Sequence, residues 1–402
     1  MYNRGQRSAL ICSWLLMFSA YASVLCVSPI LNLITQELDL TAAQGGLLFS
    51  APIVTLGVVA FVGGFLGDRV GPRRVAGAGA VLLGLAAFLR GASPDFATLL
   101  MLNLAVGMGW GLLFPNIPKL IRLWFPDRTV GTATGIYSTG VFAGGTLALG
   151  VTLPLLLPAV GSWRGACYFW GALALAIAGA WWILAREPAS SGRSGLMPSQ
   201  GSKGALDAVL RSKYIWIIAV FFALAANVTF YIITGWFPAY FVEKGFSEAA
   251  AGFLTSMLTL AGIPAVIIVP LASDRVGLRR PFLWISCLIA AVAFFSIMYT
   301  PYVLDVILMG ILGFTLTATY VICLFLPLEL VKPGHAGTAS GVVISAGYIG
   351  GALGPLIAGY LKDLGGTLIP AIVLLTVLML ISMVLAFMIP ETGWRRTVPA
   401  VL

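Results

Sequence analysis

Long apolar runs dominate the pattern of hydrophobic and polar positions in this chain. A helix needs roughly 20 apolar residues to cross a bilayer, and about twelve runs reach that length. They cover residues 9–34, 44–66, 75–92, 97–118, 131–157, 165–185, 214–240, 250–272, 281–300, 303–328, 338–360 and 367–389. The pattern therefore predicts an all-α membrane protein with twelve transmembrane helices. We interpret the first run as a retained helix rather than a signal peptide, because it stays apolar to about Ile34.

One long polar segment divides these runs into two groups of six. It covers residues 186–213, is rich in Gly and Ser, and lies between the sixth and seventh runs. We therefore expect an N-terminal six-helix bundle at residues 1–185, a cytoplasmic linker at 186–213 and a C-terminal six-helix bundle at 214–402.

Two short patterns occur twice along the chain. The charged segment Gly64–Arg74 returns as Leu271–Arg280, and the glycine pattern of residues 131–135 returns at 337–341. Both patterns recur 206 positions later (68 to 274, 131 to 337). A shared offset of this length indicates that the two halves are copies of one unit.

The positions of Lys and Arg predict the orientation. If the N-terminus is inside, nineteen of the 23 basic residues fall at cytoplasmic ends of the runs, and basic loops stay cytoplasmic. The other four, on the outside, are Arg90, Arg164, Lys244 and Lys362. We therefore expect a multi-pass protein of the cytoplasmic (inner) membrane with both termini in the cytoplasm. This distribution also accounts for the net charge of +9 without a nucleic-acid partner.

Composition excludes several classes of protein. With 60% hydrophobic and 9% charged residues, the chain is more apolar than a soluble protein of this length. The five cysteines lie in apolar runs without metal-ligand spacing, which favours packing roles. We find no catalytic triad, metal-ligand cluster or nucleotide-binding motif. The sequence therefore predicts no enzyme activity, catalytic residue, metal or cofactor.

The segment Gly64–Arg74 resembles the signature that the major facilitator superfamily of secondary transporters carries between helices two and three. Leu271–Arg280 is similar to the weaker copy between helices eight and nine, and the resemblance extends over essentially the whole chain. It implies two pseudo-symmetric six-helix bundles around a central cavity, which would be exposed to each side in turn as one bundle rocks against the other. We expect a monomer surrounded by membrane lipid.

The two charged loops are candidates for a cytoplasmic gate. Asp68 could face the positive N-terminus of the helix at 338–360, and Asp274 that of the helix at 131–157. Gly71 and Gly277 would permit the tight turns. The gating candidates are Asp68, Arg69, Gly71, Arg73, Asp274, Arg275 and Gly277. For the arginines, a topological anchor without a gating role is an equally good interpretation.

Departures from family patterns bear on the mechanism. Asn103 stands where many proton-coupled members carry Arg, and residues 140–145 lack the Pro that is typical of drug/proton antiporters. Locally, the chain is similar to the cyanate-permease and nitrate/nitrite-porter branches at Phe114–Lys119, Trp124–Pro126, Gly135–Gly140 and Ser162–Gly165. Nitrate porters are expected to hold substrate with a cavity Arg. We find no basic residue near the middle of any run, which argues against nitrate.

Polar and aromatic residues in the middle of the runs are the substrate-binding candidates. They are Tyr21, Asn116, Tyr137, Asn227, Tyr231, Trp236, Tyr320 and Tyr348, and the repeat offset pairs Tyr21 with Asn227. Packing or interhelical hydrogen bonding is the alternative for each of them. A neutral lining suits a small, weakly hydrated or partly apolar solute. If transport is coupled to protons, Glu329 is the coupling candidate, although an interfacial position would also account for this carboxylate.

The sequence therefore favours a secondary active transporter. We expect it to move a small organic solute or a monovalent anion, carboxylate or cyanate-like, across the cytoplasmic membrane by alternating access. A polyspecific drug or metabolite exporter of the same superfamily is one alternative. A non-transporting membrane receptor is an alternative from a different class.

Overall fold

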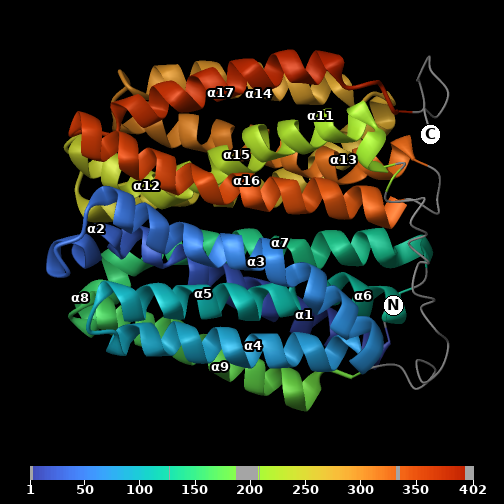
Figure 1. Ribbon diagram of the computed structural model, residues 1–402, viewed down its shortest axis with the longest axis horizontal. Coiled ribbons are helices and arrows are strands. Elements are labelled where there is room, and N and C mark those ends of the chain that lie inside the picture. The colour runs from blue at the N-terminus through green and yellow to red at the C-terminus, as the bar shows by residue number, and fades with distance from the viewer. Residues whose placement is uncertain (1–2, 126, 187–206, 208, 332–335, 394–402) are drawn as a thin grey trace.

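The computed structural model describes residues 3–125, 127–186, 207, 209–331 and 336–393. In this part of the chain, twelve helical segments are long and apolar enough to cross a membrane, which confirms the prediction of an all-α membrane fold. Figure 1 shows them running side by side along the long axis of the molecule.

The N-terminal half contributes six of these spans, several of which are built from consecutive helices. They are formed by α1 (Arg4–Leu25) with α2 (Val27–Glu37), α3 (Ala42–Val70), α4 (Pro72–Leu89) with η1 (Arg90–Ala92), α5 (Phe96–Leu113) with α6 (Asn116–Trp124), α7 (Asp127–Val151) with η2 (Thr152–Leu156) and α8 (Leu157–Val160), and α9 (Trp163–Leu184).

The C-terminal half contributes the other six. They are formed by α11 (Lys213–Phe221) with η4 (Phe222–Val228) and α12 (Thr229–Glu243), α13 (Glu248–Val276), α14 (Arg280–Ile297), α15 (Tyr302–Leu330), α16 (Ala336–Gly365) and α17 (Ile369–Met388).

Prolines account for two of the breaks within spans. The first span is interrupted at Cys26, because Pro29 has no N–H to donate to the Leu25 carbonyl. Pro115 lies between α5 and α6 in the same way. Two further interruptions, η2 and η4, are π-helical turns.

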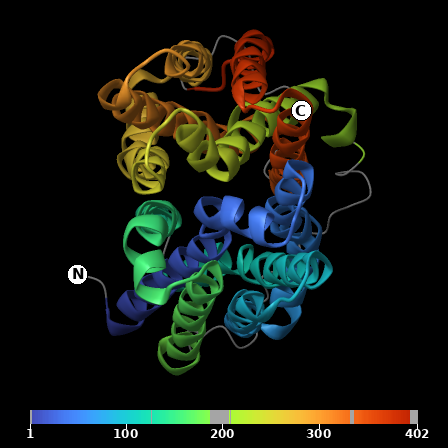
Figure 2. The same ribbon diagram turned by 90° about the vertical axis from the view of Figure 1, so that its left-hand side faces the viewer.

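The helices form two pseudo-symmetric bundles, with α1 to α9 in one and α11 to α17 in the other (Figures 1 and 2). The bundles contact each other mainly through α3 against α16 and α7 against α13. We call the end of the molecule at which α1 begins and α17 ends the terminal side, and the opposite end, where α2 ends and α3 begins, the distal side.

Small residues bring helices of one bundle close together. A Cβ atom at Gly144 of α7 would lie 2.2 Å from the Phe18 carbonyl oxygen of α1, and one at Gly140 would lie 2.5 Å from that of Trp14. Backbones that approach this closely are typical of helix packing in lipid, where no hydrophobic force acts between helices. On the periphery, large apolar side chains such as Phe61 are exposed, as a lipid-facing surface requires.

Arg90 lies at the end of the third span rather than in the loop that follows it. It begins the short turn η1 that ends the third span, and its side chain folds into the N-terminal bundle with 1% of the residue exposed. Its Nη1 donates to the Ser23 carbonyl oxygen at 2.6 Å. Because α1 ends two residues later, the guanidinium interacts with the negative end of that helix, a favourable position for a cation.

Candidate functional site

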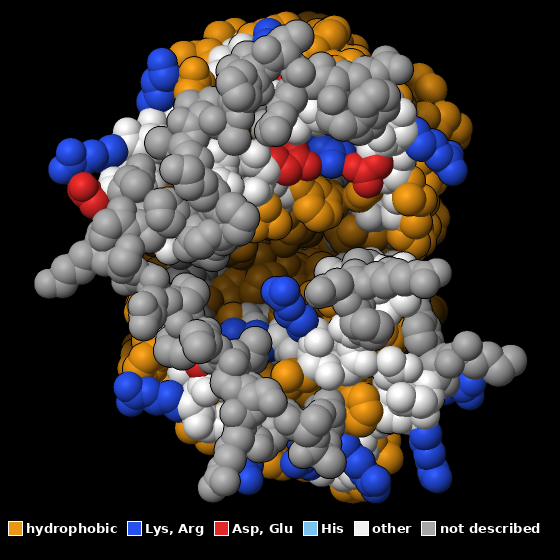
Figure 3. All heavy atoms as spheres, turned by 90° about the vertical axis from the view of Figure 1, so that its right-hand side faces the viewer, with side chains coloured by type: hydrophobic (Ala, Val, Ile, Leu, Met, Phe, Trp, Pro, Cys, Tyr) orange, Lys and Arg blue, Asp and Glu red, His pale blue; other side chains and the backbone are white. Residues whose placement is uncertain are grey.

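A cavity of about 900 Å³ lies between the two bundles. Its walls come from α1, α6 and α7 of the N-terminal half and from η4, α12, α13, α15 and α16 of the C-terminal half. Seen from the terminal side, the molecule is hollowed between its halves (Figure 3). The cavity is therefore accessible from the terminal side.

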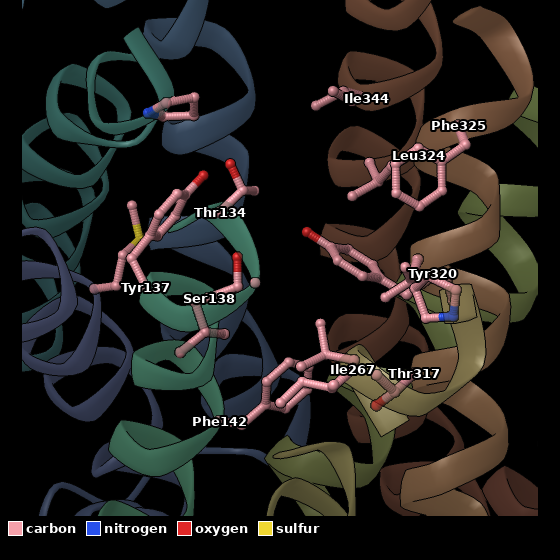
Figure 4. Close-up of a pocket in the computed structure, with 18 of the residues that line it drawn as sticks. Thr134, Tyr137, Ser138, Phe142, Ile267, Thr317, Tyr320, Leu324, Phe325 and Ile344 are labelled. Carbon is pink, nitrogen blue, oxygen red and sulfur yellow. The ribbon is translucent and has the colours of Figure 1, made fainter. Parts of the chain in front are cut away.

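Five tyrosines from five helices line this cavity, and all five are sequence-predicted site residues. They are Tyr21, Tyr137, Tyr231, Tyr320 and Tyr348. The hydroxyls of Tyr320 and Tyr348 lie 3.5 Å apart. Figure 4 shows Tyr137 and Tyr320 on opposite walls, with their hydroxyls directed into the space between the bundles. A solute in this space would meet phenolic donors from both halves.

Asn227, the repeat counterpart of Tyr21, also lines the cavity. It lies in the π-helical turn η4, and its Nδ2 donates to the Phe222 carbonyl oxygen at 3.1 Å. π-Turns inside α-helices are frequent at functional sites. Gly347 of α16 faces this turn, because a Cβ there would lie 2.3 Å from the Phe222 ring. The turn and the glycine together hold the amide at the cavity wall.

Four hydroxyl side chains of the lining are absent from the sequence-predicted set: Thr132, Thr134, Ser138 and Thr317. Thr134 and Ser138 are four residues apart on α7, with Tyr137 between them (Figure 4). Residues at this spacing share one face of a helix. The helical period around Tyr137 is therefore the signal that could have identified them.

The remaining lining is aromatic or aliphatic and includes Phe114, Phe142, Phe230 and Phe325. Among the described residues of the lining, Asp274 has the only charged side chain. The described lining can therefore offer hydrogen bonds from hydroxyls and an amide, together with contacts to rings, and none of its described residues is a cation.

Two predicted site residues lie outside the lining. Asn116 of α6 is fully buried and its Nδ2 donates to the carbonyl oxygens of Gly63 and Leu112, which ties α6 to α3. Trp236 of α12 donates through Nε1 to the Pro355 carbonyl oxygen at 2.8 Å. Both side chains hold helices of one bundle together.

The first charged loop lies at the terminal end of the N-terminal bundle. Asp68 pairs with Lys119 of α6, and Arg69 stacks over the Phe65 ring at 4.2 Å. Arg73 donates to the Trp182 carbonyl oxygen of α9. Gly71, which separates α3 from α4, has φ of 104°, a conformation that side chains with a Cβ rarely adopt.

The second charged loop is more strongly interconnected. Arg279 pairs with Asp274 at 2.7 Å and with Glu329 of α15 at 2.8 Å. Burial lowers the pKa of the Arg279 guanidinium, but hydrogen bonds and charge pairing with these carboxylates outweigh burial and raise it above its usual value. Gly277 ends α13 with φ of 73°, and Arg275 is exposed.

The segment after α17 joins this cluster. The Glu391 carboxylate accepts the backbone N–H groups of Arg279 and Arg280 at the start of α14, and the Thr392 hydroxyl donates to Glu329. Glu329 therefore lies in an ion-pair network at the terminal side rather than in the cavity lining.

Comparisons with known proteins identify the family. The Major Facilitator Superfamily model matches residues 13–355 and 245–400. The cyanate transport protein CynX of Escherichia coli (strain K12) is 28% identical over 342 residues, covering 85% of this chain and 86% of the relative. The 2-nitroimidazole transporter of the same organism is 29% identical over 346 residues, 84% of each chain.

A solved structure shows the same fold. A bacterial homologue of the human lysosomal transporter Spinster, in an inward-facing and unoccupied conformation, superposes with a TM-score of 0.80 at 17% identity, covering 97% of this chain and 98% of that one. The relatives are transporters rather than enzymes. The chain is a membrane transporter and belongs to the major facilitator superfamily.

Proposed function

We propose that this protein is a secondary transporter of the cytoplasmic membrane that moves a small organic solute or a monovalent organic anion by alternating access. The observation that carries the proposal is the neutral, tyrosine-lined cavity between two repeat-related bundles, open toward one end of the molecule. Because most of the basic residues that the structure describes lie at the terminal side, we assign that side to the cytoplasm. The structure then corresponds to the state open to the cytoplasm.

The dimensions and chemistry of the cavity narrow the substrate class. A volume of about 900 Å³ is in the range of pockets that bind drug-sized molecules. An anion as small as cyanate would leave most of this space to water and could contact few of the tyrosines at once. A planar organic solute with one polar or anionic group would place that group against the phenols and Asn227, and its apolar part against Phe114 or Phe142. Similarity to a 2-nitroimidazole transporter supports this class more directly than similarity to a cyanate transporter.

Uptake into proteoliposomes tests the proposal. The protein would be reconstituted with radiolabelled benzoate, 2-nitroimidazole and cyanate as separate probes, and counterflow exchange measured for each. We expect exchange of at least one of the two organic probes, with weaker binding in Tyr21→Ala and Asn227→Ala. Tyr360→Ala is the matched control, because Tyr360 of α16 is 56% exposed on the outer surface. Absence of counterflow for all three probes would contradict the proposed substrate class.

We propose the charged loops as the cytoplasmic gate. In the state open to the other side, the terminal ends of the bundles would meet, and Asp68 and Asp274 could then face the starts of α16 and α7. In the observed state, Asp68 instead pairs with Lys119 and Asp274 with Arg279.

Proton coupling has a separate test. Glu329 remains the candidate. Because its carboxylate pairs with Arg279 and accepts from Thr392, protonation of Glu329 would weaken its contacts with the start of α14 and with the segment after α17. We expect Glu329→Gln to abolish accumulation driven by a pH gradient while counterflow persists. Accumulation equal to that of the wild type would remove Glu329 from this role.

A polyspecific exporter of amphipathic compounds is the second candidate. The apolar residues toward the cavity mouth, including Leu324, Phe325 and Leu328, favour it. Extrusion of a structurally diverse set of cationic and neutral drugs from everted vesicles, without uptake of the organic probes, would establish it in place of the first proposal.

A further inference from the structure

The distal side is closed by a contact between the two halves in which Asp363 is central. Asp363 lies near the end of α16, and its carboxylate reaches the first turn of α3 in the other bundle. Its Oδ1 accepts the N–H of Ala42 at 2.8 Å and its Oδ2 accepts that of Ala43 at 2.7 Å. A charged side chain from one half therefore caps a helix of the other half.

The first turn of α3 depends on this carboxylate for its hydrogen bonds. The first backbone N–H groups of a helix have no partner within it. Here Thr41 accepts from Gln44 N–H, and the Gln44 side chain accepts from Thr41 N–H, which together form a capping box. The box does not serve the N–H groups of Ala42 and Ala43. Asp363 supplies both missing acceptors and places a negative charge at the positive end of the helix dipole.

The surrounding backbone holds α3 and α16 in this register. A Cβ atom at Gly46 of α3 would lie 2.3 Å from the Pro355 carbonyl oxygen, and one at Gly359 of α16 would lie 2.4 Å from that of Ala42. The two helices thus touch through backbone about one and two turns of α16 before the carboxylate. Separation of the bundles at the distal side must break these contacts and the two hydrogen bonds together.

Neighbouring charges do not compete for Asp363. Lys362, next to it in sequence, pairs with Glu243 at 2.7 Å and lies over the Trp236 ring, both within the C-terminal half.

The arrangement also has no counterpart at the repeat-related position. The residue 206 positions before Asp363 is Leu157, and the equivalent helix α13 is capped by its own Ser247. A single carboxylate therefore makes this bridge between the halves in the described part of the chain.

We propose that Asp363 is a distal latch: its carboxylate stabilises the state closed at the distal side by capping α3 across the interface, and its release accompanies opening on that side. This proposal rests on the alternating access proposed above. Opening would expose the carboxylate and both N–H groups to water, so the latch biases the equilibrium without blocking it. Removing the charge shifts the equilibrium toward the distal-open state by about fivefold, as expected for a carboxylate at an exposed helix N-terminus.

Electron–electron distance measurements across the distal side test the latch. Spin labels would be placed at Ala159→Cys in the N-terminal half and Thr367→Cys in the C-terminal half, both exposed positions, while the five native cysteines are buried. Asp363→Asn should increase the population at the longer distance about fivefold relative to the shorter one. Asp95→Asn is the matched control, because Asp95 caps α5 within one bundle by accepting from Thr98 N–H.

A second variant removes the partner instead of the carboxylate. Ala42→Pro deletes one donor N–H at the first position of α3, where proline is well tolerated, and the preceding Thr41 has ψ of 159°, which suits a residue before proline. It should also favour the longer distance. In the double variant the effects should be less than additive, because both substitutions remove one interaction.

The distance distributions of these variants either support the latch or overturn it. A longer-distance population that rises in Asp363→Asn and Ala42→Pro but not in Asp95→Asn supports the latch. Unchanged distributions in both variants, or fully additive effects in the double variant, overturn it. If Asp363→Asn does not fold, Ala42→Pro alone decides in the same way. Counterflow in proteoliposomes is measured separately, so a failed latch is distinguishable from a failed transport assignment.

Discussion

Replacing Tyr348 by Phe removes one hydroxyl from the cavity with almost no change in shape. Tyr348 is 3% exposed, and its hydroxyl lies 3.5 Å from that of Tyr320, a long contact at which either atom could donate. Loss of this weak contact should cost less than about 1 kcal/mol of folding stability. The hydroxyl can therefore exchange this weak contact for a hydrogen bond to a solute. A hydrogen bond to a charged group contributes about 1.5–3 kcal/mol, so a carboxylate probe should bind at least about tenfold more weakly to the variant. A neutral probe, with a bond nearer 1 kcal/mol, should lose about fivefold.

Isothermal titration of benzoate and 2-nitroimidazole into purified protein would measure both losses, with counterflow as the functional readout. Tyr360→Phe is the control, because Tyr360 lies on the same helix with 56% of its surface exposed. A Tyr348→Phe variant that binds both probes with wild-type affinity would refute the reasoning that the tyrosine hydroxyls contact the solute.

Three further changes test other parts of the structure. Asp68→Asn should slow counterflow about tenfold, because a charge-assisted contact of the closed cytoplasmic gate is lost; unchanged turnover, with binding still measurable, would contradict a gating role. Gly144→Val should destabilise the N-terminal bundle by at least about 1–3 kcal/mol, since its side chain would collide with the Phe18 carbonyl oxygen; a thermal melt identical to that of the wild type would show that α1 and α7 can separate freely. Arg279→Met should lower the free energy of unfolding by about 2 kcal/mol, seen as a lower melting temperature, because Glu329 loses its charged partner in a partly buried site. Arg275→Met, at an exposed position, should have little effect on the melting temperature.

The spans could be predicted because crossing a bilayer requires long apolar runs. The repeat could be predicted because two patterns recur at one constant offset. Twelve apolar runs gave twelve spans, with helix ends several residues longer than the runs because polar residues continue the helices beyond the membrane. Of the residues predicted to bind substrate, the five tyrosines and Asn227 line one cavity, and their role in binding stays a prediction. Aromatic hydroxyls in the middle of a span need partners, and a cavity between bundles provides them.

The rest could not be read from the sequence because its helices are apolar all round. Without a polar face, the period of a helix does not say which side meets the cavity. Asn116 and Trp236 are as buried as the tyrosines, yet they bond to backbone carbonyls within one bundle. The side chain of Arg90 folds inward because α1 ends at Leu25 and leaves the Ser23 carbonyl oxygen as an acceptor. The π-turn at Asn227 does not change the sequence of apolar residues, so the pattern does not predict it.

The uncharged waist of the molecule also determines how membrane voltage can act on it. The described cavity lining has one charged side chain, Asp274 near the terminal end of α13, so as the bundles rock the potential acts mainly through the solute's own charge. Moving one elementary charge across 100 mV changes the free energy by about 2.3 kcal/mol. A neutral solute would therefore equilibrate independently of voltage. A monovalent anion crossing alone would be held about fiftyfold more dilute inside a cell with an inside-negative potential of that size. Uptake of such an anion to a concentration equal to that outside would then need a cation to travel with it or another anion to leave in exchange, whereas efflux at equal concentrations would need neither.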